Sequence, residues 1–88
     1  MNITQRTPMA RSSIARLNQL ARRYEREGYD GPSAVVAAAD EYGLIRVRAY
    51  DESGILYRTR RGRFVFGWTN HDSIAAGCGF DDQVYDAE

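Results

Sequence analysis

The chain has 88 residues, a formal net charge of zero and 43% hydrophobic residues. This length holds one domain, because a second independent core would need roughly 50 more residues. All twelve basic residues are arginines, so every cation is a planar guanidinium suited to carboxylate, phosphate or aromatic partners. The single cysteine, Cys78, excludes an internal disulfide and a cysteine-rich zinc site.

The N-terminal segment predicts a flexible arm over residues 1–11, since the residues around Pro8 show no hydrophobic period. Within this arm, residues 2–5 are compatible with a short strand. The segment has no apolar core of the kind that signal peptides carry, and the longest apolar run, residues 34–39, is too short to span a bilayer. We therefore expect a cytoplasmic protein without a membrane segment.

Two helices are predicted next. From a serine cap at Ser12 or Ser13, apolar residues recur at helical spacing as far as Glu27, and Gly28 is the expected stop. The second helix, residues 33–42, has a narrow face of small residues that suits close packing. The opposite side of the first helix forms a cationic surface with four arginines: Arg16, Arg22, Arg23 and Arg26.

From position 44 the hydrophobic period changes to two, which predicts strands over residues 44–50, 55–60 and 63–69. The connecting loops have hairpin lengths, so the strands form an antiparallel meander. The predicted fold class is α+β, with two N-terminal helices packed on one face of a three-stranded antiparallel sheet in the order ααβββ. The domain spans residues 12–76, and an acidic C-terminal tail follows over residues 77–88.

The first hairpin can close in two ways. If residues 51–54 all lie in the loop, the apolar side chains of the first strand share a face with Arg58 and Arg60. If residues 52–54 form a three-residue loop with Gly54 in the left-handed conformation, one face becomes apolar. We favour the second closure, because a two-residue loop at residues 61–62 then places the aromatic side chains of the third strand on the same apolar face. The predicted core face comprises Ile45, Val47, Ala49, Ile55, Tyr57, Thr59, Phe64, Phe66 and Trp68, and it leaves Val65 more exposed than either Phe.

The opposite sheet face is the first candidate binding surface. In the favoured register Arg46 lies across from Arg60 and Arg48 across from Arg58, and opposed like charges cost about 0.2–1 kcal/mol per pair. Screening by water and salt, pairing with the acidic tail, or a partner that supplies phosphates or carboxylates would offset this cost. The candidate binding residues are Arg46, Arg48, Tyr50, Arg58, Arg60 and Arg63, and the arginines of the first helix form the second candidate surface.

The charge is unevenly distributed along the chain. Residues 1–26 contain six arginines and one acidic residue, whereas residues 64–88 contain five acidic residues and no cation. Such a polarised neutral protein suits oriented binding to a partner more than non-specific adhesion to nucleic acid.

No catalytic centre, metal site or cofactor site is predicted. His71, Asp72 and Ser73 are adjacent in the chain, so they cannot converge on one another as a catalytic triad does. Cys78 lies between two glycines and is expected to be accessible, but no third group is available to orient it with His71 as a nucleophile. The acidic residues after position 80 match no EF-hand spacing, which favours a solvated tail.

These features predict a small non-enzymatic protein-binding module, an inhibitor or adaptor that docks an Arg-rich surface on an acidic protein or nucleoprotein partner. Compact chains without catalytic groups are typical of phage and mobile-element accessory proteins that block host defence complexes, anti-CRISPR proteins among them. The alternative is a nucleic-acid-binding module that uses the Arg-rich sheet face. Tyr50 is the only aromatic residue on that predicted face, whereas proteins that read single strands usually stack bases on two or three rings.

Overall fold

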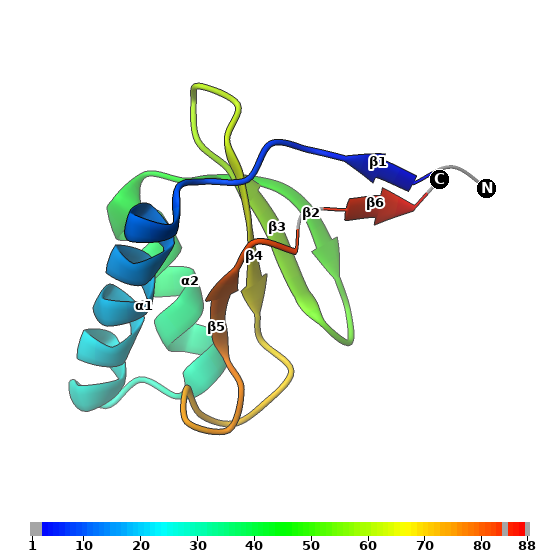
Figure 1. The fold of residues 1–88 in the computed structure, drawn as a ribbon. Helices are drawn as coiled ribbons and strands as arrows, with labels where there is room; N and C mark the ends of the chain where they lie inside the picture. The colour runs from blue at the N-terminus through cyan, green and yellow to red at the C-terminus, as the bar shows by residue number, and fades with distance from the viewer. Residues whose placement is uncertain (1–2, 84, 88) are drawn as a thin grey trace.

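The computed structural model describes residues 3–83 and 85–87. The predicted α+β class is confirmed, with both helices on one side of the main sheet (Figure 1). None of the helices in these ranges has both the length and the apolar character needed to cross a bilayer. In chain order the elements are β1 (Ile3–Gln5), α1 (Arg11–Arg26), α2 (Gly31–Tyr42), β2 (Ile45–Tyr50), β3 (Gly54–Arg58), β4 (Phe64–Trp68), β5 (Gly79–Asp81) and β6 (Tyr85–Ala87).

The ends of the two helices follow local capping chemistry. α1 begins one residue before the predicted serine cap, and Gly28 follows its last turn with a φ of 108°. α2 begins earlier than predicted because the Asp30 carboxylate accepts a hydrogen bond from the Ser33 backbone N–H at 2.8 Å. Gly43, in the left-handed conformation with a φ of 87°, ends α2 as the sequence predicts.

The main sheet has four antiparallel strands in the order β2-β3-β4-β5, and a separate two-stranded sheet pairs β1 with β6 near the chain ends (Figure 1). The predicted three-strand count is therefore corrected to four. The fourth strand, β5, comes from residues that the sequence analysis placed in the acidic tail. Its residue Phe80 and the preceding Cys78 are each 5% exposed, because both pack into the core beneath the helices.

The outer edge of β5 is closed by a side chain of α1. The Asn18 amide nitrogen donates a hydrogen bond to the Phe80 carbonyl oxygen at 3.0 Å. The Asn18 side-chain oxygen accepts a second hydrogen bond from the Phe80 N–H at 2.8 Å. The amide thus takes the place of a neighbouring strand for this residue.

The first hairpin does not have the predicted register. Tyr50 pairs with Gly54, so the loop consists of residues 51–53 and Gly54 belongs to β3. The predicted left-handed conformation of Gly54 is wrong, since this glycine has no positive φ. Lack of space explains why residue 54 is a glycine. A Cβ atom at this position would lie 2.0 Å from the carbonyl oxygen of Gly67 in β4.

The second hairpin carries the left-handed glycine that was predicted for the first. Thr59 donates its N–H to the Arg63 carbonyl oxygen at 2.8 Å, which leaves a loop of residues 60–62 in place of the predicted two-residue loop. Gly62 has a φ of 83°, as the third residue of such a loop requires. The pairing of β3 with β4 moves by one residue, and every β4 side chain therefore lies on the opposite face from the one predicted.

The sheet consequently has apolar side chains on both faces. On the helix side, Tyr57 and Val65 pack with α1 and α2, and on the other side Leu56 packs with Phe66. The burial of Phe66 is confirmed at 8% exposure, but its predicted face is wrong, and Val65 is fully buried rather than more exposed. The predicted core residues of β2 also lie outside the core in part, since Val47 is 39% exposed.

Candidate functional site

The sheet face that points away from the helices carries a cluster of aromatic side chains. We call it the aromatic face and define it by Tyr50, Leu56, Phe64, Phe66 and Trp68. The centroid of the Phe66 ring lies 4.7 Å from that of Trp68, at an interplanar angle of 63°, and 5.8 Å from that of Tyr50. Edge-to-face packing of this kind stabilises the rings as a group.

The indole of Trp68 is held in place by β5. Its Nε1–H donates a hydrogen bond to Asp81 Oδ2 at 2.6 Å. The other carboxylate oxygen of Asp81 accepts the N–H of Gln83 at 2.8 Å. Asp81, which the sequence analysis assigned to a solvated tail, therefore fixes the orientation of the largest ring on the aromatic face.

A small cavity of about 180 Å³ opens on the aromatic face. It is smaller than the clefts that hold cofactors, which usually measure about 300–1,000 Å³. Its size suits a single amino-acid side chain. The lining residues are Tyr50, Ser53, Phe66, Trp68 and Gln83.

Two guanidinium groups stack on rings of this face. The Arg48 guanidinium carbon lies 5.0 Å from the centroid of the Tyr50 ring, and that of Arg6 lies 4.9 Å from the centroid of Phe64. Contacts at these distances are cation–π interactions. They place positive charge directly beside the aromatic rings.

The structure brings only part of the predicted binding set together. Arg48 and Tyr50 share the aromatic face, and Arg58 joins them because it pairs with Phe64 across the β3–β4 ladder. The guanidinium of Arg58 also donates a hydrogen bond to the Thr59 carbonyl oxygen at 3.1 Å. These three predicted residues form one continuous group with the aromatic cluster.

Arg46 lies on the opposite side of the sheet. The ladder between β2 and β3 shifts between Arg46 and Arg48, so Arg46 pairs with Tyr57, a residue of the helix-side core. Burial raises the pKa of Tyr57, and the guanidinium of Arg46 acts against that shift. The irregularity in β2 therefore divides the predicted arginine surface between two faces.

Arg60 and Arg63 lie at the β3–β4 hairpin, away from the aromatic face. Arg63 lines a hollow of about 730 Å³ and Arg60 one of about 370 Å³, and both hollows are bordered by Tyr42 at the end of α2. The predicted pairs of opposed arginines are thus wrong. Arg48 faces Leu56 rather than Arg58, and no like-charge cost arises across this ladder.

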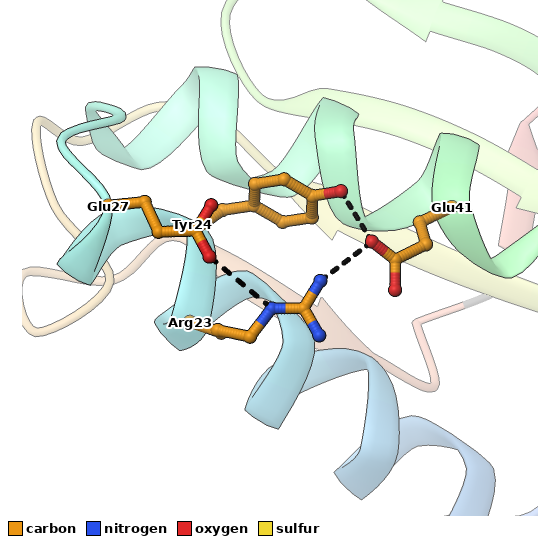
Figure 2. Close-up of polar contacts among 4 residues, drawn as sticks. All are labelled: Arg23, Tyr24, Glu27 and Glu41. Atoms are coloured by element: carbon orange, nitrogen blue, oxygen red, sulfur yellow. Dashed lines mark hydrogen bonds and ion pairs between the residues drawn. The ribbon is translucent and has the colours of Figure 1, made fainter.

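On the second candidate surface, Arg23 is engaged in a network between the two helices (Figure 2). Its Nη2 donates to Glu41 Oε1 at 2.7 Å, and its Nε lies 3.7 Å from the Glu27 carboxylate. The hydroxyl of Tyr24 donates to the same oxygen of Glu41. Arg23 therefore serves the packing of α1 on α2.

The other arginines of α1 are exposed to solvent. Arg16 and Arg26 line a hollow of about 400 Å³ beside Leu20, whereas Arg22 lies outside it. No aromatic cluster comparable to the one on the sheet accompanies them in the described residues that line this hollow. Beside these arginines the rings of Tyr24 and Tyr29 form a pair, with centroids 5.0 Å apart, and the Arg23 guanidinium carbon lies 5.3 Å from the centroid of Tyr24.

The network around Glu41 predicts a pH dependence of stability. The hydrogen bond from Tyr24, followed by the charge of Arg23, lowers the pKa of Glu41, while desolvation opposes the shift. A carboxyl whose pKa is lower in the folded state stabilises the fold above its unfolded pKa, and this contribution is lost as the pH falls through the folded value. We expect Glu41→Gln to reduce the loss of thermal stability between neutral and acidic pH, measured by circular dichroism.

The matched control for this measurement is Asp40→Asn. It neutralises the neighbouring carboxylate and leaves the contacts among Arg23, Tyr24 and Glu41 intact. Identical pH profiles for Glu41→Gln and the unmodified protein would show that the network does not contribute to acid sensitivity.

The expected accessibility of Cys78 is wrong. Its side chain is buried in the core, and its Sγ donates a hydrogen bond to the His71 carbonyl oxygen at 3.0 Å. Burial raises the pKa of this thiol, which disfavours the nucleophilic thiolate. Across the described ranges no three His, Cys, Asp or Glu side chains converge as a metal site would require, and Glu88 lies outside those ranges.

Sequence reasoning missed the functional potential of three rings and of the carboxylate that holds one of them. Phe64, Phe66 and Trp68 were assigned to the core beneath the helices, and Asp81 to the tail. Glycine at position 67 was the available signal. Gly67 alternates with the rings along β4 and faces the helices, whereas the rings face away from them. A Cβ atom at this position would lie 3.0 Å from a methyl carbon of Val35 in α2.

Comparisons with protein-family models, with curated proteins and with solved structures find no match to this chain.

Proposed function

We propose that this protein is a small protein-binding module that docks through its aromatic face on a partner with an acidic surface. Within this class, an adaptor and an inhibitor that blocks a defence complex, of the anti-CRISPR kind, would both use such a surface. The proposed binding residues are Arg48, Tyr50, Arg58 and Trp68, with Arg6 beside them.

The observation that carries the proposal is the composition of the sheet face that the helices leave uncovered. Trp, Tyr and Arg are the residues that contribute most often to the binding energy of protein interfaces. Here Tyr50 and Trp68 border a cavity of about 180 Å³, and Arg48 stacks on the first of these rings. An apolar side chain of the partner fits the cavity, while carboxylates of the partner fit the arginines.

The side chains of this face are held before binding. Asp81 fixes the indole of Trp68, and the Thr59 carbonyl accepts a hydrogen bond from Arg58. A preorganised surface loses less side-chain entropy on binding than exposed arginines on a helix. This difference favours the aromatic face over the arginines of α1 as the docking surface.

A nucleic-acid-binding module is the second candidate, because the corrected register places four aromatic rings beside the arginines where the sequence predicted one. Two features make it weaker: Phe66 is 8% exposed and has little ring area for a base, and Arg48 already covers the ring of Tyr50.

The double substitution Arg48→Glu with Arg58→Glu tests the proposal. We expect it to reduce capture of the partner from a lysate of the source cells at least about tenfold, since each reversal replaces an attraction by a repulsion of similar size. Quantitative mass spectrometry of the captured proteins is the measurement. Circular dichroism of the double variant must show a retained fold, because the substitutions also remove the stacking of Arg48 on Tyr50 and the hydrogen bond from Arg58 to the Thr59 carbonyl oxygen.

The matched control is Arg22→Glu with Arg26→Glu, which makes the same change of charge on α1. This variant should keep most of the captured partner. If the α1 variant loses the partner and the sheet variant keeps it, the docking surface lies on the helices and the proposal is wrong.

Generic DNA and RNA separate the two candidate functions. A nucleic-acid-binding module would bind them at low salt, with an affinity that falls steeply on a log–log plot against salt concentration. We expect no such binding for the protein-binding module. A steep slope that Arg48→Glu with Arg58→Glu removes would favour the second candidate.

A further inference from the structure

The loop of the β3–β4 hairpin concentrates positive charge. Arg60, Arg61 and Arg63 lie close together in the chain, and all three are exposed. Figure 1 shows this loop projecting beyond the ends of the helices. Within the part of the chain that the structure describes, their side chains take part in no ion pair or hydrogen bond. Because like charges repel one another, an anion among these guanidinium groups would be attracted by all of them.

Two hollows meet at these arginines. Arg61 and Arg63 line the hollow of about 730 Å³, whereas Arg60 and Arg61 line the neighbouring one of about 370 Å³. Tyr42 and Thr59 border both hollows, so the two spaces adjoin. Clefts that hold small molecules usually measure about 300–1,000 Å³. The space therefore suits a small molecule.

The walls of the larger hollow carry hydrogen-bond donors. Ser13, Tyr42 and Thr59 contribute hydroxyl groups beside the two arginines. Among the described residues that line either hollow there is no aspartate or glutamate, and the first turn of α1 has none either. Guanidinium and hydroxyl groups without a competing carboxylate are well suited to a phosphate group.

The backbone around the larger hollow is fixed on two sides. Thr59 donates its N–H to the Arg63 carbonyl oxygen at 2.8 Å, and its Oγ1 accepts the Arg63 N–H at 3.1 Å. In the segment before α1, Met9 donates its N–H to the Phe64 carbonyl oxygen at 2.8 Å, and Phe64 donates its own N–H to the Thr7 carbonyl oxygen at 2.9 Å. Because the backbone is already ordered, only side chains lose freedom when a ligand binds.

We infer that the larger hollow binds the phosphate group of a small phosphorylated molecule, which Arg61 and Arg63 contact. A phosphate monoester carries about 1.5 to 2 negative charges at neutral pH, and two guanidinium groups neutralise them. The adjoining hollow has room for the rest of the molecule, beside Arg60. This site lies away from the aromatic face, and the inference does not depend on the proposed function.

The experiment is an NMR titration of the backbone amides at constant ionic strength. The probes are inorganic phosphate, glucose 6-phosphate and adenosine 5′-monophosphate. We expect each to shift the amides of residues 59–63 with a Kd below about 1 mM, whereas glucose and adenosine leave them unchanged. The ester with the lower Kd identifies whether a sugar phosphate or a nucleotide fits the adjoining hollow better. Equal shifts with sodium chloride, or no shift with any phosphate, would overturn the inference.

The double substitution Arg61→Gln with Arg63→Gln should weaken binding of the phosphate probes at least about tenfold, since each lost hydrogen bond joins charged groups. Both side chains are exposed, so the amide spectrum of the variant should show a retained fold. Arg22→Gln with Arg26→Gln removes the same charge from α1 and is the matched control. Equal weakening by the two variants would mean that the phosphates respond to overall charge, and the inference would be wrong.

Two further measurements separate this site from the other proposals. Single-stranded DNA of about eight nucleotides tests whether the arginines bind a nucleic-acid backbone instead. Binding of this DNA far more tightly than either ester, lost in Arg61→Gln with Arg63→Gln, would overturn the inference. The same variant should keep the protein partner captured through the aromatic face. Loss of that partner would make the hairpin part of the docking surface and contradict a small-molecule site, whereas failure of the phosphate titration leaves the proposed function intact.

Discussion

Replacing Gly54 with alanine is expected to destabilise the protein by at least about 3 kcal/mol, which is a large part of the stability of a domain of this size. The added Cβ atom would lie 2.0 Å from the carbonyl oxygen of Gly67 and 2.9 Å from its carbonyl carbon. Backbone atoms cannot move away as a flexible side chain does, so β3 and β4 must separate locally. Urea denaturation followed by circular dichroism measures the loss.

Gly62→Ala is the matched control, because this glycine differs from Gly54 in the reason for its presence. Gly62 has a φ of 83°, and an added Cβ atom would meet nothing within 4 Å. Its replacement should cost about 1–2 kcal/mol, the penalty for a left-handed residue with a side chain. Equal costs at the two positions would contradict the close approach of β4 to Gly54.

The second large effect is expected for Phe66→Ala, which should destabilise the fold by about 3–5 kcal/mol. The ring is 8% exposed and packs with Leu56, Tyr50 and Trp68 on the aromatic face. Removal of the ring leaves a void among these side chains. No residue of a helix belongs to this cluster, so no helix can move in to fill the void. Equilibrium unfolding in urea gives the free energy of unfolding.

Phe66→Leu provides the comparison, since an apolar substitution that keeps most of the volume usually costs less than about 1.5 kcal/mol. The partner should also bind Phe66→Ala poorly wherever that variant is folded, because Phe66 lines the cavity. A cost below about 1 kcal/mol for Phe66→Ala would mean that the aromatic face is loosely packed.

The helices and the fold class could be predicted from the sequence because their signals are local. The apolar spacing of α1 and the glycines at positions 28 and 43 mark where each helix ends. These features depend on residues within a few positions of one another. They therefore need no knowledge of what the helices pack against.

The register of the sheet could not be predicted in the same way. In β4, Phe64, Phe66 and Trp68 alternate with Val65 and Gly67, so both faces of the strand are apolar and the period of two has no unique phase. The predicted two-residue loop at residues 61–62 assigned the rings to the wrong face, because the loop comprises residues 60–62. The helix side takes the smaller residues because α2 approaches closely, with a methyl carbon of Val35 3.0 Å from where a Cβ atom of residue 67 would lie.

The candidate site was predicted only in part, because the residues that share a face depend on the register of the sheet. Arg48, Tyr50 and Arg58 were assigned to one face, and the structure places them together. Arg46 lies on the other face because the register of β2 shifts between Arg46 and Arg48. No turn residue in the sequence indicates this shift. The strand β5 escaped prediction because three residues are too few to show a period, although its contact through Asn18 is specific.

The contact between Asn18 and Phe80 joins residues 62 positions apart. The first helix and the last strand of the main sheet therefore depend on each other, and β1 pairs with β6 at the two ends of the chain. During synthesis, the N-terminal helix leaves the ribosome long before its partner strand exists. Closure of such long loops slows folding, so the contacts of α1 with β5 form only after residues 79–81 have been translated, whereas its contacts with α2 need only residues up to 42.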